Sequence, residues 1–222
     1  MTPDTWARFD RYTTDLFGLS DPALDAALAA SVAAGLPSIQ VSPAHGKLLM
    51  LLGRMQQARA ILEIGTLGAY STIWLARGLA SGGHLITLEA DPGHAAVARE
   101  NLARAGLSSV VDVRVGRAIE TLPELAVEGH APFDLIFIDA DKPSYPDYLA
   151  WSLRLSRRGT VIVADNVVRR AAASDTSDPA VEGIRRFNEQ LAADPRVTST
   201  VLQVVNAKGY DGFAMALVTA DP

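Results

Sequence analysis

The spacing of the hydrophobic positions changes near residue 60 of the chain. Before that point apolar residues recur at helical intervals, and Asp21-Pro22 and Ser42-Pro43 are typical helix starts. We therefore predict that residues 1–57 form helices that pack on the rest of the chain. The helix after Pro43 is expected to place four apolar side chains on one side, namely Leu48, Leu49, Leu52 and Met55.

Beyond residue 60, short apolar runs alternate with helical segments. Continuous apolar runs are typical of parallel strands that are buried on both faces of a sheet. The predicted strands lie near residues 60–64, 84–89, 110–115, 135–138 and 161–164. The expected fold class is α/β, with a mostly parallel sheet and helices on both faces.

The C-terminal part of the chain follows a different pattern. Asp178-Pro179 should start a helix whose inward-facing residues are Ala180, Ile184, Phe187 and Leu191. Residues 201–205 and 213–218 are expected to form an antiparallel pair across the turn 206–212. Because no linker, repeat or low-complexity tract interrupts the chain, we expect residues 1–222 to form one domain, with an α/β core from residue 58.

Composition narrows the possible partners and the cellular location. The 222 residues include 20 Lys and Arg against 25 Asp and Glu, and this net charge of −5 argues against a nucleic-acid partner. The chain lacks a signal-peptide pattern and any apolar stretch near the roughly 20 residues of a membrane helix. It contains no cysteine, which excludes disulfides and thiolate metal sites. We therefore expect a cytoplasmic protein with neither a membrane nor a nucleic-acid partner.

Polar residues stand where two of the predicted strands end. Asp139 follows the run 135–138, and Asp165-Asn166 follows the run 161–164. If the two strands are neighbours, three oxygen donors meet there, a set that suits Mg²⁺, Mn²⁺ or Ca²⁺. Lys142 lies within reach of a molecule held by such a cation. The pattern indicates a metal-assisted active site, whereas each motif taken alone is also compatible with a helix cap or a turn.

A second group of candidate residues surrounds the first predicted strand. That strand ends in the glycine turn 65–71, where the backbone can approach a ligand closely. Glu89 ends the next strand and can accept hydrogen bonds from ribose hydroxyls, so we expect an adenosine-bearing cofactor. A dinucleotide fits less well, because the turn lacks the three-glycine spacing. Glu63 would also repel phosphate and would instead suit a cationic amino-acid or sulfonium group.

Other polar residues receive simpler interpretations. The four histidines show no metal-ligand spacing, and His94 in a first helical turn is expected to be exposed. Arg169-Arg170 is expected to belong to a solvated face, with contact to an anionic substrate as the alternative.

Several short motifs occur in a fixed order along the chain. They are Leu62-Glu63-Ile64-Gly65-Thr66, Tyr70-Ser71-Thr72, Glu89-Ala90-Asp91-Pro92, Asp139-Ala140-Asp141-Lys142, Ala164-Asp165-Asn166 and Asp211-Gly212-Phe213. This ordered set resembles the cation-dependent O-methyltransferases of the catechol and caffeoyl-coenzyme A type. The resemblance implies a Rossmann-like methyltransferase fold, with a seven-stranded sheet whose last strand is antiparallel. It also implies S-adenosylmethionine as the methyl donor.

Carried over position by position, the resemblance implies roles for individual residues. The implied cofactor contacts are Val41, Glu63, Gly65, Thr66, Ser71, Glu89, Ala118 and Asp139. The implied metal ligands are Asp139, Asp165 and Asn166. Lys142 corresponds to the catalytic lysine and acts beside Asp139. One departure is Ala69, which stands where the family usually has glycine and would be strained if its φ is positive.

The resemblance therefore predicts an O-methyltransferase. It would move a methyl group from S-adenosylmethionine to a phenolic hydroxyl of a vicinal-dihydroxy aromatic, assisted by a divalent cation. The resemblance also implies a homodimer, and the apolar segment 213–218 near a predicted sheet edge favours a covered surface. Two other interpretations stay open at this point, an NAD-dependent Rossmann oxidoreductase and a non-catalytic nucleoside-binding protein.

Overall fold

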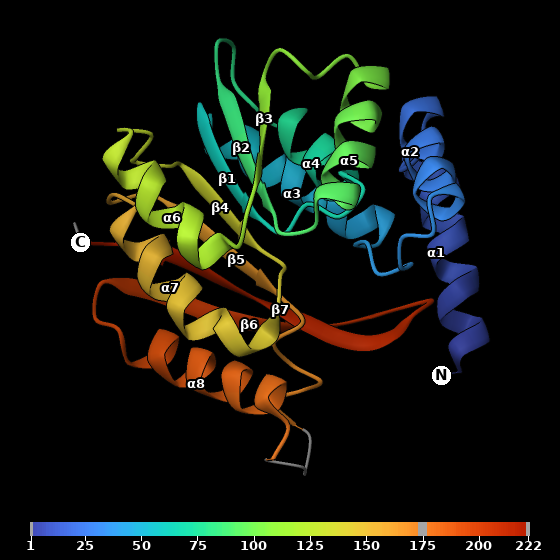
Figure 1. The fold of residues 1–222 in the computed structure, drawn as a ribbon. Coiled ribbons are helices and arrows are strands. Elements are labelled where there is room, and N and C mark those ends of the chain that lie inside the picture. The colour runs from blue at the N-terminus through green and yellow to red at the C-terminus, as the bar shows by residue number, and fades with distance from the viewer. Residues whose placement is uncertain (1, 173–176, 221–222) are drawn as a thin grey trace.

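The computed structural model describes residues 2–172 and 177–220 of the chain (Figure 1). Within these residues, seven strands form one sheet in the order β3-β2-β1-β4-β5-β7-β6. β1 to β5 run parallel, whereas β7 runs antiparallel to both of its neighbours. The predicted fold class is thus confirmed. The strands are β1 (Ala60–Ile64), β2 (His84–Glu89), β3 (Val111–Val115), β4 (Leu135–Ile138), β5 (Val161–Asp165), β6 (Val197–Asn206) and β7 (Gly209–Val218).

Helices cover both faces of the sheet (Figure 1). One face carries α6 (Ala118–Val127), α7 (Tyr145–Arg154) and α8 (Pro179–Ala193). The other carries α2 (Pro22–Ala33), α3 (Pro43–Met55), α4 (Tyr70–Ala76) and α5 (Pro92–Arg104). α1 (Pro3–Phe17) lies beside β6, and the short 3₁₀ turn η1 (Lys142–Ser144) joins β4 to α7. None of the helices in the described part of the chain is long and apolar enough to span a membrane.

The predicted helix starts are confirmed by their caps. The side chain of Asp21 accepts hydrogen bonds from the backbone amides of Ala23 and Leu24, and proline occupies the first helical position. Ser42 and Asp178 cap α3 and α8 in the same way. Each cap satisfies an amide that the helix itself leaves unpaired, which is worth about 1 kcal/mol.

The sheet divides the hydrophobic core into two layers, because successive side chains of a strand point to opposite faces. Leu62 and Ile64 of β1 pack with α6, α7 and α8, whereas Ile61 packs with α2 to α5. Fully burying one such side chain stabilises the fold by about 1.5–3 kcal/mol. In α8, the residues Ile184, Phe187 and Leu191 are buried as predicted, while Ala180 is only half-buried.

Three of the four apolar residues predicted for the buried side of α3 pack on the core, with Leu49 fully buried and Leu48 and Leu52 half-buried, whereas Met55 does not. Met55 is 78% exposed, and the packed face is formed by Gly46, Leu49, Met50 and Gly53. A Cβ atom at Gly46 would lie 2.2 Å from the Trp74 ring, and one at Gly53 would lie 3.2 Å from the backbone of Gly78. The prediction for Met55 was wrong because it relied on the large apolar residues alone, whereas two glycines of α3 make the close contacts with α4 and with the turn that follows it.

The C-terminal hairpin is longer than predicted. Asn206 pairs with Gly209, so the connection is the dipeptide Ala207-Lys208 and not the segment 206–212. The apolar residues 213–218 belong to β7, which lies between β5 and β6 and is therefore not a sheet edge. The expectation of an edge at this segment was wrong, because ten residues of β6 pair along the whole of β7.

Candidate active site

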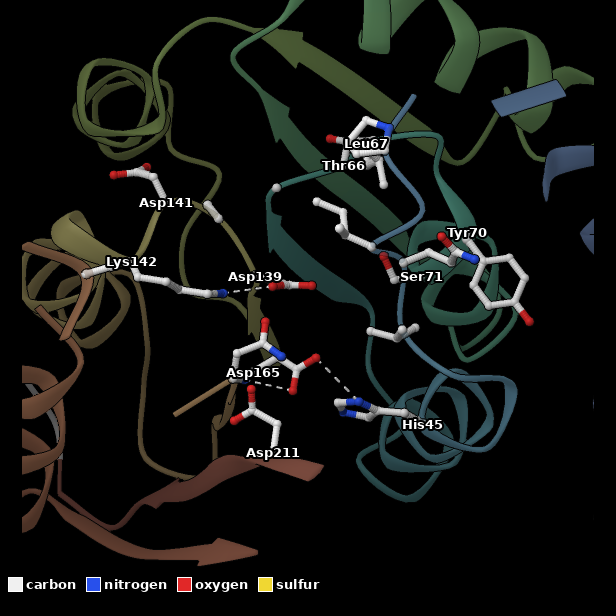
Figure 2. Close-up of a pocket in the computed structure, with 18 of the residues that line it drawn as sticks. His45, Thr66, Leu67, Tyr70, Ser71, Asp139, Asp141, Lys142, Asp165 and Asp211 are labelled. Atoms are coloured by element: carbon white, nitrogen blue, oxygen red, sulfur yellow. Dashed lines mark hydrogen bonds and ion pairs between the residues drawn. The ribbon is translucent and has the colours of Figure 1, made fainter. Parts of the chain in front are cut away.

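A cavity of about 830 Å³ opens at the carboxyl ends of β1, β2, β4 and β5 (Figure 2). Open α/β sheets bind their ligands at this edge, where the loops leave the parallel strands. The segment before α3, the start of α6 and the β6–β7 turn complete the wall of the cavity. This volume is sufficient for a ligand of the size of a nucleoside together with a small aromatic molecule.

All but one of the residues predicted for the site line this cavity. Those that line it are Val41, Gly65, Thr66, Ser71, Glu89, Ala118, Asp139, Lys142, Asp165 and Asn166. The remaining residue, Glu63, is fully buried and contacts Ser71.

Glu63 is enclosed by hydroxyl groups. Its carboxylate accepts hydrogen bonds from the hydroxyls of Ser71 (2.6 Å), Thr72 (2.5 Å) and Thr87 (2.7 Å). Burial raises the pKa of Glu63 to about 7, while the three hydroxyl bonds act in the opposite direction. Glu63 thus fixes the hydroxyl of Ser71. Ser71 lines the cavity, whereas Glu63 does not.

Glu89 organises the loops beside the glycine turn. One carboxylate oxygen accepts hydrogen bonds from the amides of Thr66 (3.2 Å) and Leu67 (2.7 Å), and the other from the amide of Asp91 (3.0 Å). His94 was expected to be exposed, but it is half-buried, with Nδ1 3.7 Å from Glu89. The carboxylate therefore holds two loops in place while its edge remains part of the cavity wall.

The turn between β1 and α4 approaches the end of β4 closely. Gly65 has a φ of 101°, and a Cβ atom there would lie 2.1 Å from the carbonyl oxygen of Asp139. Only glycine fits this position. Ala69 has a φ of 65°, so the strain predicted for this alanine is present, at a cost of about 1–2 kcal/mol.

Two carboxylates meet at the neighbouring strand ends. Ile138 of β4 pairs with Ala164 of β5, so Asp139 and Asp165 leave the sheet side by side. The side chain of Asp165 is 10% exposed. Burial raises the pKa of Asp165, and the charge of Asp139 raises it further. Asn166 follows with a φ of 59° and donates its backbone N–H to Asp165 (2.9 Å).

Lys142 faces this pair of carboxylates from η1 (Figure 2). Its Nζ donates hydrogen bonds to Oδ1 of Asp139 (2.9 Å) and to the hydroxyl of Tyr145 (2.5 Å). Tyr145 is fully buried, and its hydroxyl reaches the carbonyl oxygens of Asp165 (2.9 Å) and Ile138 (3.2 Å). Tyr145 was not among the site residues predicted from the sequence. Its position three residues after Lys142, on the same side of a helical turn, was the available signal.

His45 also belongs to the site, although the histidine spacing gave no reason to expect it. Its ring stacks on Phe213 with 4.9 Å between centroids, and Nδ1 lies 3.6 Å from Oδ2 of Asp165. Burial lowers the pKa of His45 to about 4, so the imidazole is neutral at neutral pH. Its Nε2 atom is buried and has no hydrogen-bond partner among the described residues.

Arginines lie at the wall of the cavity beyond Asn166. Arg169 and Arg170 line it, with side chains that are 53% and 40% exposed. Nε of Arg169 lies 3.7 Å from Asp211, whose other oxygen accepts the backbone N–H of Arg169 (3.0 Å). The predicted solvated face is therefore also a cavity wall, and Asp211 shapes the loop that follows Asn166.

The donors at the strand ends are compatible with a hard divalent cation. Asp139 and Asp165 offer carboxylate oxygens, and Asn166 offers an amide oxygen from the same edge. Across the described ranges, no group of three or more His, Cys, Asp or Glu side chains has an arrangement that could hold a metal ion. At this edge, the amide of Asn166 could add a third protein oxygen to the two carboxylates.

Comparison with known proteins gives a consistent result. A sequence model of the family described as O-methyltransferase matches residues 20–217. The chain is 56% identical over 220 residues to a catechol O-methyltransferase of Niastella koreensis, covering 98% of this chain and 100% of the relative. The structure of an O-methyltransferase from Bacillus cereus in complex with SAH has a TM-score of 0.96 and 53% identity, with 98% and 100% of the two chains covered. An O-methyltransferase from Streptomyces achromogenes in complex with SAM has a TM-score of 0.94 and 48% identity, with 99% and 100% covered.

The tight contact at Gly65 can be tested with a pair of glycine variants. Gly106 has a φ of 70° and no atom near its missing Cβ, so Gly106→Ala introduces backbone strain alone. We expect Gly106→Ala to lower the free energy of unfolding by about 1–2 kcal/mol. Gly65→Ala should lower it by about 2–5 kcal/mol, because overpacking against Asp139 adds to the same strain. Urea unfolding measures both values, and equal losses would show that the end of β4 yields to the added methyl group.

Proposed function

We propose that this chain, which belongs to the O-methyltransferase family, methylates a phenolic hydroxyl of a catechol-like substrate. The methyl donor in this proposal is S-adenosylmethionine, and a divalent cation assists the reaction. The observation that carries the proposal is the meeting of Asp139, Asp165, Asn166 and Lys142 in one cavity, beside the glycine turn of β1. The catechol O-methyltransferase relatives and the SAM- and SAH-bound neighbours support it.

The donor would occupy the part of the cavity between β1, β2 and the start of α6. The close backbone at Gly65 and the hydroxyl of Ser71, fixed by Glu63, suit the amino-acid end of such a molecule. Glu89 ends β2 with its carboxylate in the cavity wall, where ribose hydroxyls can donate to it. Ala118 at the start of α6 would lie by the adenine ring. Val41, Thr66 and Asp139 complete the proposed contacts. When bound, S-adenosylmethionine supplies an electrophilic methyl group.

Asp139, Asp165 and Asn166 would hold the divalent cation. Mg²⁺, Mn²⁺ or Ca²⁺ suits these oxygens, and a bound cation would supply positive charge that favours ionisation of a nearby phenol. The neutral His45 beside Asp165 adds no competing positive charge. The fold holds the two carboxylates close together in a partly buried place, where they repel each other unless a cation is bound between them.

Lys142 is the proposed general base. A free phenol has a pKa of about 10, so at neutral pH a base must take its proton before the oxygen can attack. In its neutral form, Nζ of Lys142 accepts that proton while Asp139 and Tyr145 keep the side chain in place. The cavity would hold the methyl acceptor and the methyl donor in a fixed orientation, which supplies a further share of the rate. No observation favours an NAD-dependent oxidoreductase or a non-catalytic nucleoside-binding protein over this function.

Removal of divalent metal tests the proposed reaction as a whole. The protein with S-adenosylmethionine, catechol and Mg²⁺ should form methylated catechol, detected by mass spectrometry. Chelator treatment should abolish product formation, because it removes the cation that would favour ionisation of the phenol. Asp165→Ala should weaken Mn²⁺ binding in calorimetry and leave S-adenosylmethionine binding intact, whereas Asp147→Ala on the exposed face of α7 should change neither. Full turnover of the metal-free protein would refute the metal assignment.

Substitution of Lys142 tests the general base. Lys142→Ala should lower kcat by about 10²–10⁴-fold with small changes in metal and S-adenosylmethionine affinity. Lys142→Arg should restore little activity, because a guanidinium stays protonated and cannot accept the phenol proton. Lys47→Ala is the control, since the Lys47 ammonium lies 5.4 Å from the Trp74 ring and does not line the cavity. Near-normal kcat in both Lys142 variants would rule out this base.

We also propose that the protein is a homodimer. The segment 213–218 gives no support, because β7 is an inner strand. Support comes instead from exposed apolar side chains on two neighbouring elements, α1 and β6. These side chains are Phe9, Tyr12, Leu16, Phe17, Val201, Leu202 and Val205. Light scattering at micromolar concentration should give twice the chain mass of 23.6 kDa, and a single chain mass would contradict the proposal.

A further inference from the structure

Tyr145 connects the two strand ends with the proposed base. Its ring is fully buried at the start of α7 and packs edge-on against Phe187, with 5.4 Å between centroids. Its hydroxyl lies 2.9 Å from the carbonyl oxygen of Asp165, 3.2 Å from that of Ile138 and 2.5 Å from Nζ of Lys142. One hydroxyl therefore has three polar neighbours, and it carries only one proton.

The chemistry of these neighbours decides where the proton of Tyr145 points. A phenol ordinarily has a pKa of about 10, so the buried Tyr145 hydroxyl carries its proton at neutral pH. A carbonyl oxygen can only accept a hydrogen bond. The Tyr145 proton is thus given to the carbonyl of Asp165 or of Ile138, and the lone pairs of the hydroxyl oxygen face Lys142.

This arrangement in turn limits the orientation of the Lys142 amine. A tetrahedral nitrogen has four positions, one of which is its own carbon. Two more are taken by the acceptors Asp139 and Tyr145, and both need an N–H from Lys142. A neutral amine has two N–H groups, so the fourth position holds its lone pair. Because Lys142 lines the cavity, that position is the one left for the substrate.

We propose that Tyr145 is a positioning residue that aims the Nζ lone pair of Lys142 at the phenolic hydroxyl of the substrate that accepts the methyl group. The inference rests on the proposed function, because it assigns Tyr145 a part in the same proton transfer. The Tyr145 hydroxyl accepts one amine N–H, Asp139 accepts the other, and rotation of the amine about its Cε–Nζ bond is restricted. Without that hydroxyl, the amine can turn an N–H toward the substrate in place of its lone pair.

Two methyl-accepting substrates, catechol and 4-nitrocatechol, show whether Tyr145 positions the base or only stabilises the structure of the site. Tyr145→Phe should lower kcat for catechol by about 10- to 100-fold, a part of the contribution of a general base. KM and the S-adenosylmethionine Kd should change by less than about threefold, since the cofactor and metal residues stay in place. With 4-nitrocatechol, whose phenol is already ionised near neutral pH, kcat should fall by less than about threefold. Equal losses of kcat with both acceptors would overturn the proposal, because damage to the metal site slows both.

A double-mutant cycle gives an independent test. In the Lys142→Ala background, with radiolabelled methyl groups to detect slow turnover, Tyr145→Phe should lower kcat for catechol by less than about twofold. Tyr148→Phe is the matched control, because the Tyr148 hydroxyl contacts Asp141 and not Lys142. The fold-loss of kcat in the double variant Lys142→Ala/Tyr148→Phe should equal the product of the fold-losses of the two single variants. Multiplying losses for Tyr145→Phe as well would show that Tyr145 does not act through Lys142.

A second substitution keeps the test valid if Tyr145→Phe does not fold. 4-Aminophenylalanine at position 145 has nearly the same volume and still donates to the carbonyl of Asp165, but it accepts a hydrogen bond poorly. It should lower kcat for catechol and spare 4-nitrocatechol, and an unchanged kcat for catechol would contradict the proposal. If the wild-type protein methylates neither acceptor, the proposed function fails, which is distinct from failure of the role of Tyr145.

Discussion

The site depends on two carboxylates that the sheet forces together. β4 and β5 are parallel neighbours in a register that pairs Ile138 with Ala164, so Asp139 and Asp165 emerge side by side. Burial raises the pKa of Asp165, and repulsion by the charge of Asp139, which is stronger in a partly buried place than in water, raises it further. Of the two carboxylates, only that of Asp139 accepts a hydrogen bond from Lys142. The remaining negative charge is what a divalent cation would bind.

Several buried polar groups keep this unfavourable arrangement in place. Glu63 is saturated by hydroxyls and fixes Ser71, and Glu89 holds the amides of the glycine turn. Tyr145 joins the carbonyl groups at the ends of β4 and β5 through one hydroxyl. Each group satisfies polar atoms that would cost about 1–3 kcal/mol if buried unpaired. The cavity is therefore largely preorganised, and the same bonds that stabilise the loops also orient the groups proposed to act on the substrate.

The sequence predicted those features that depend on local rules. Strand positions follow from short apolar runs, and helix starts such as Asp21-Pro22 follow from caps, since both are set by neighbouring residues. The meeting of Asp139 with Asp165 followed from one general rule, that polar residues after neighbouring parallel strands share an edge. Their assignment as metal ligands rested on this set of oxygen donors and on the family resemblance, and it stays a prediction.

The features that were missed depend on contacts between distant segments. The sequence did not show that glycines of α3 form its packed face in place of Met55, because the residue that Gly46 packs against, Trp74, lies in another helix. His45 of α3 stacks in the site on Phe213 of β7, a residue far along the chain. The role of the Tyr145 hydroxyl requires both strand ends to be in place. Neither periodicity nor residue type contains this information.

The central claim is that a divalent cation binds between the ends of β4 and β5. Anomalous diffraction from a crystal grown with Mn²⁺ and SAH tests it most directly. A single strong anomalous peak is expected about 2.0–2.6 Å from oxygen atoms of Asp139, Asp165 and Asn166. The absence of such a peak at saturating Mn²⁺, or a peak elsewhere with these three side chains free of metal, would contradict it.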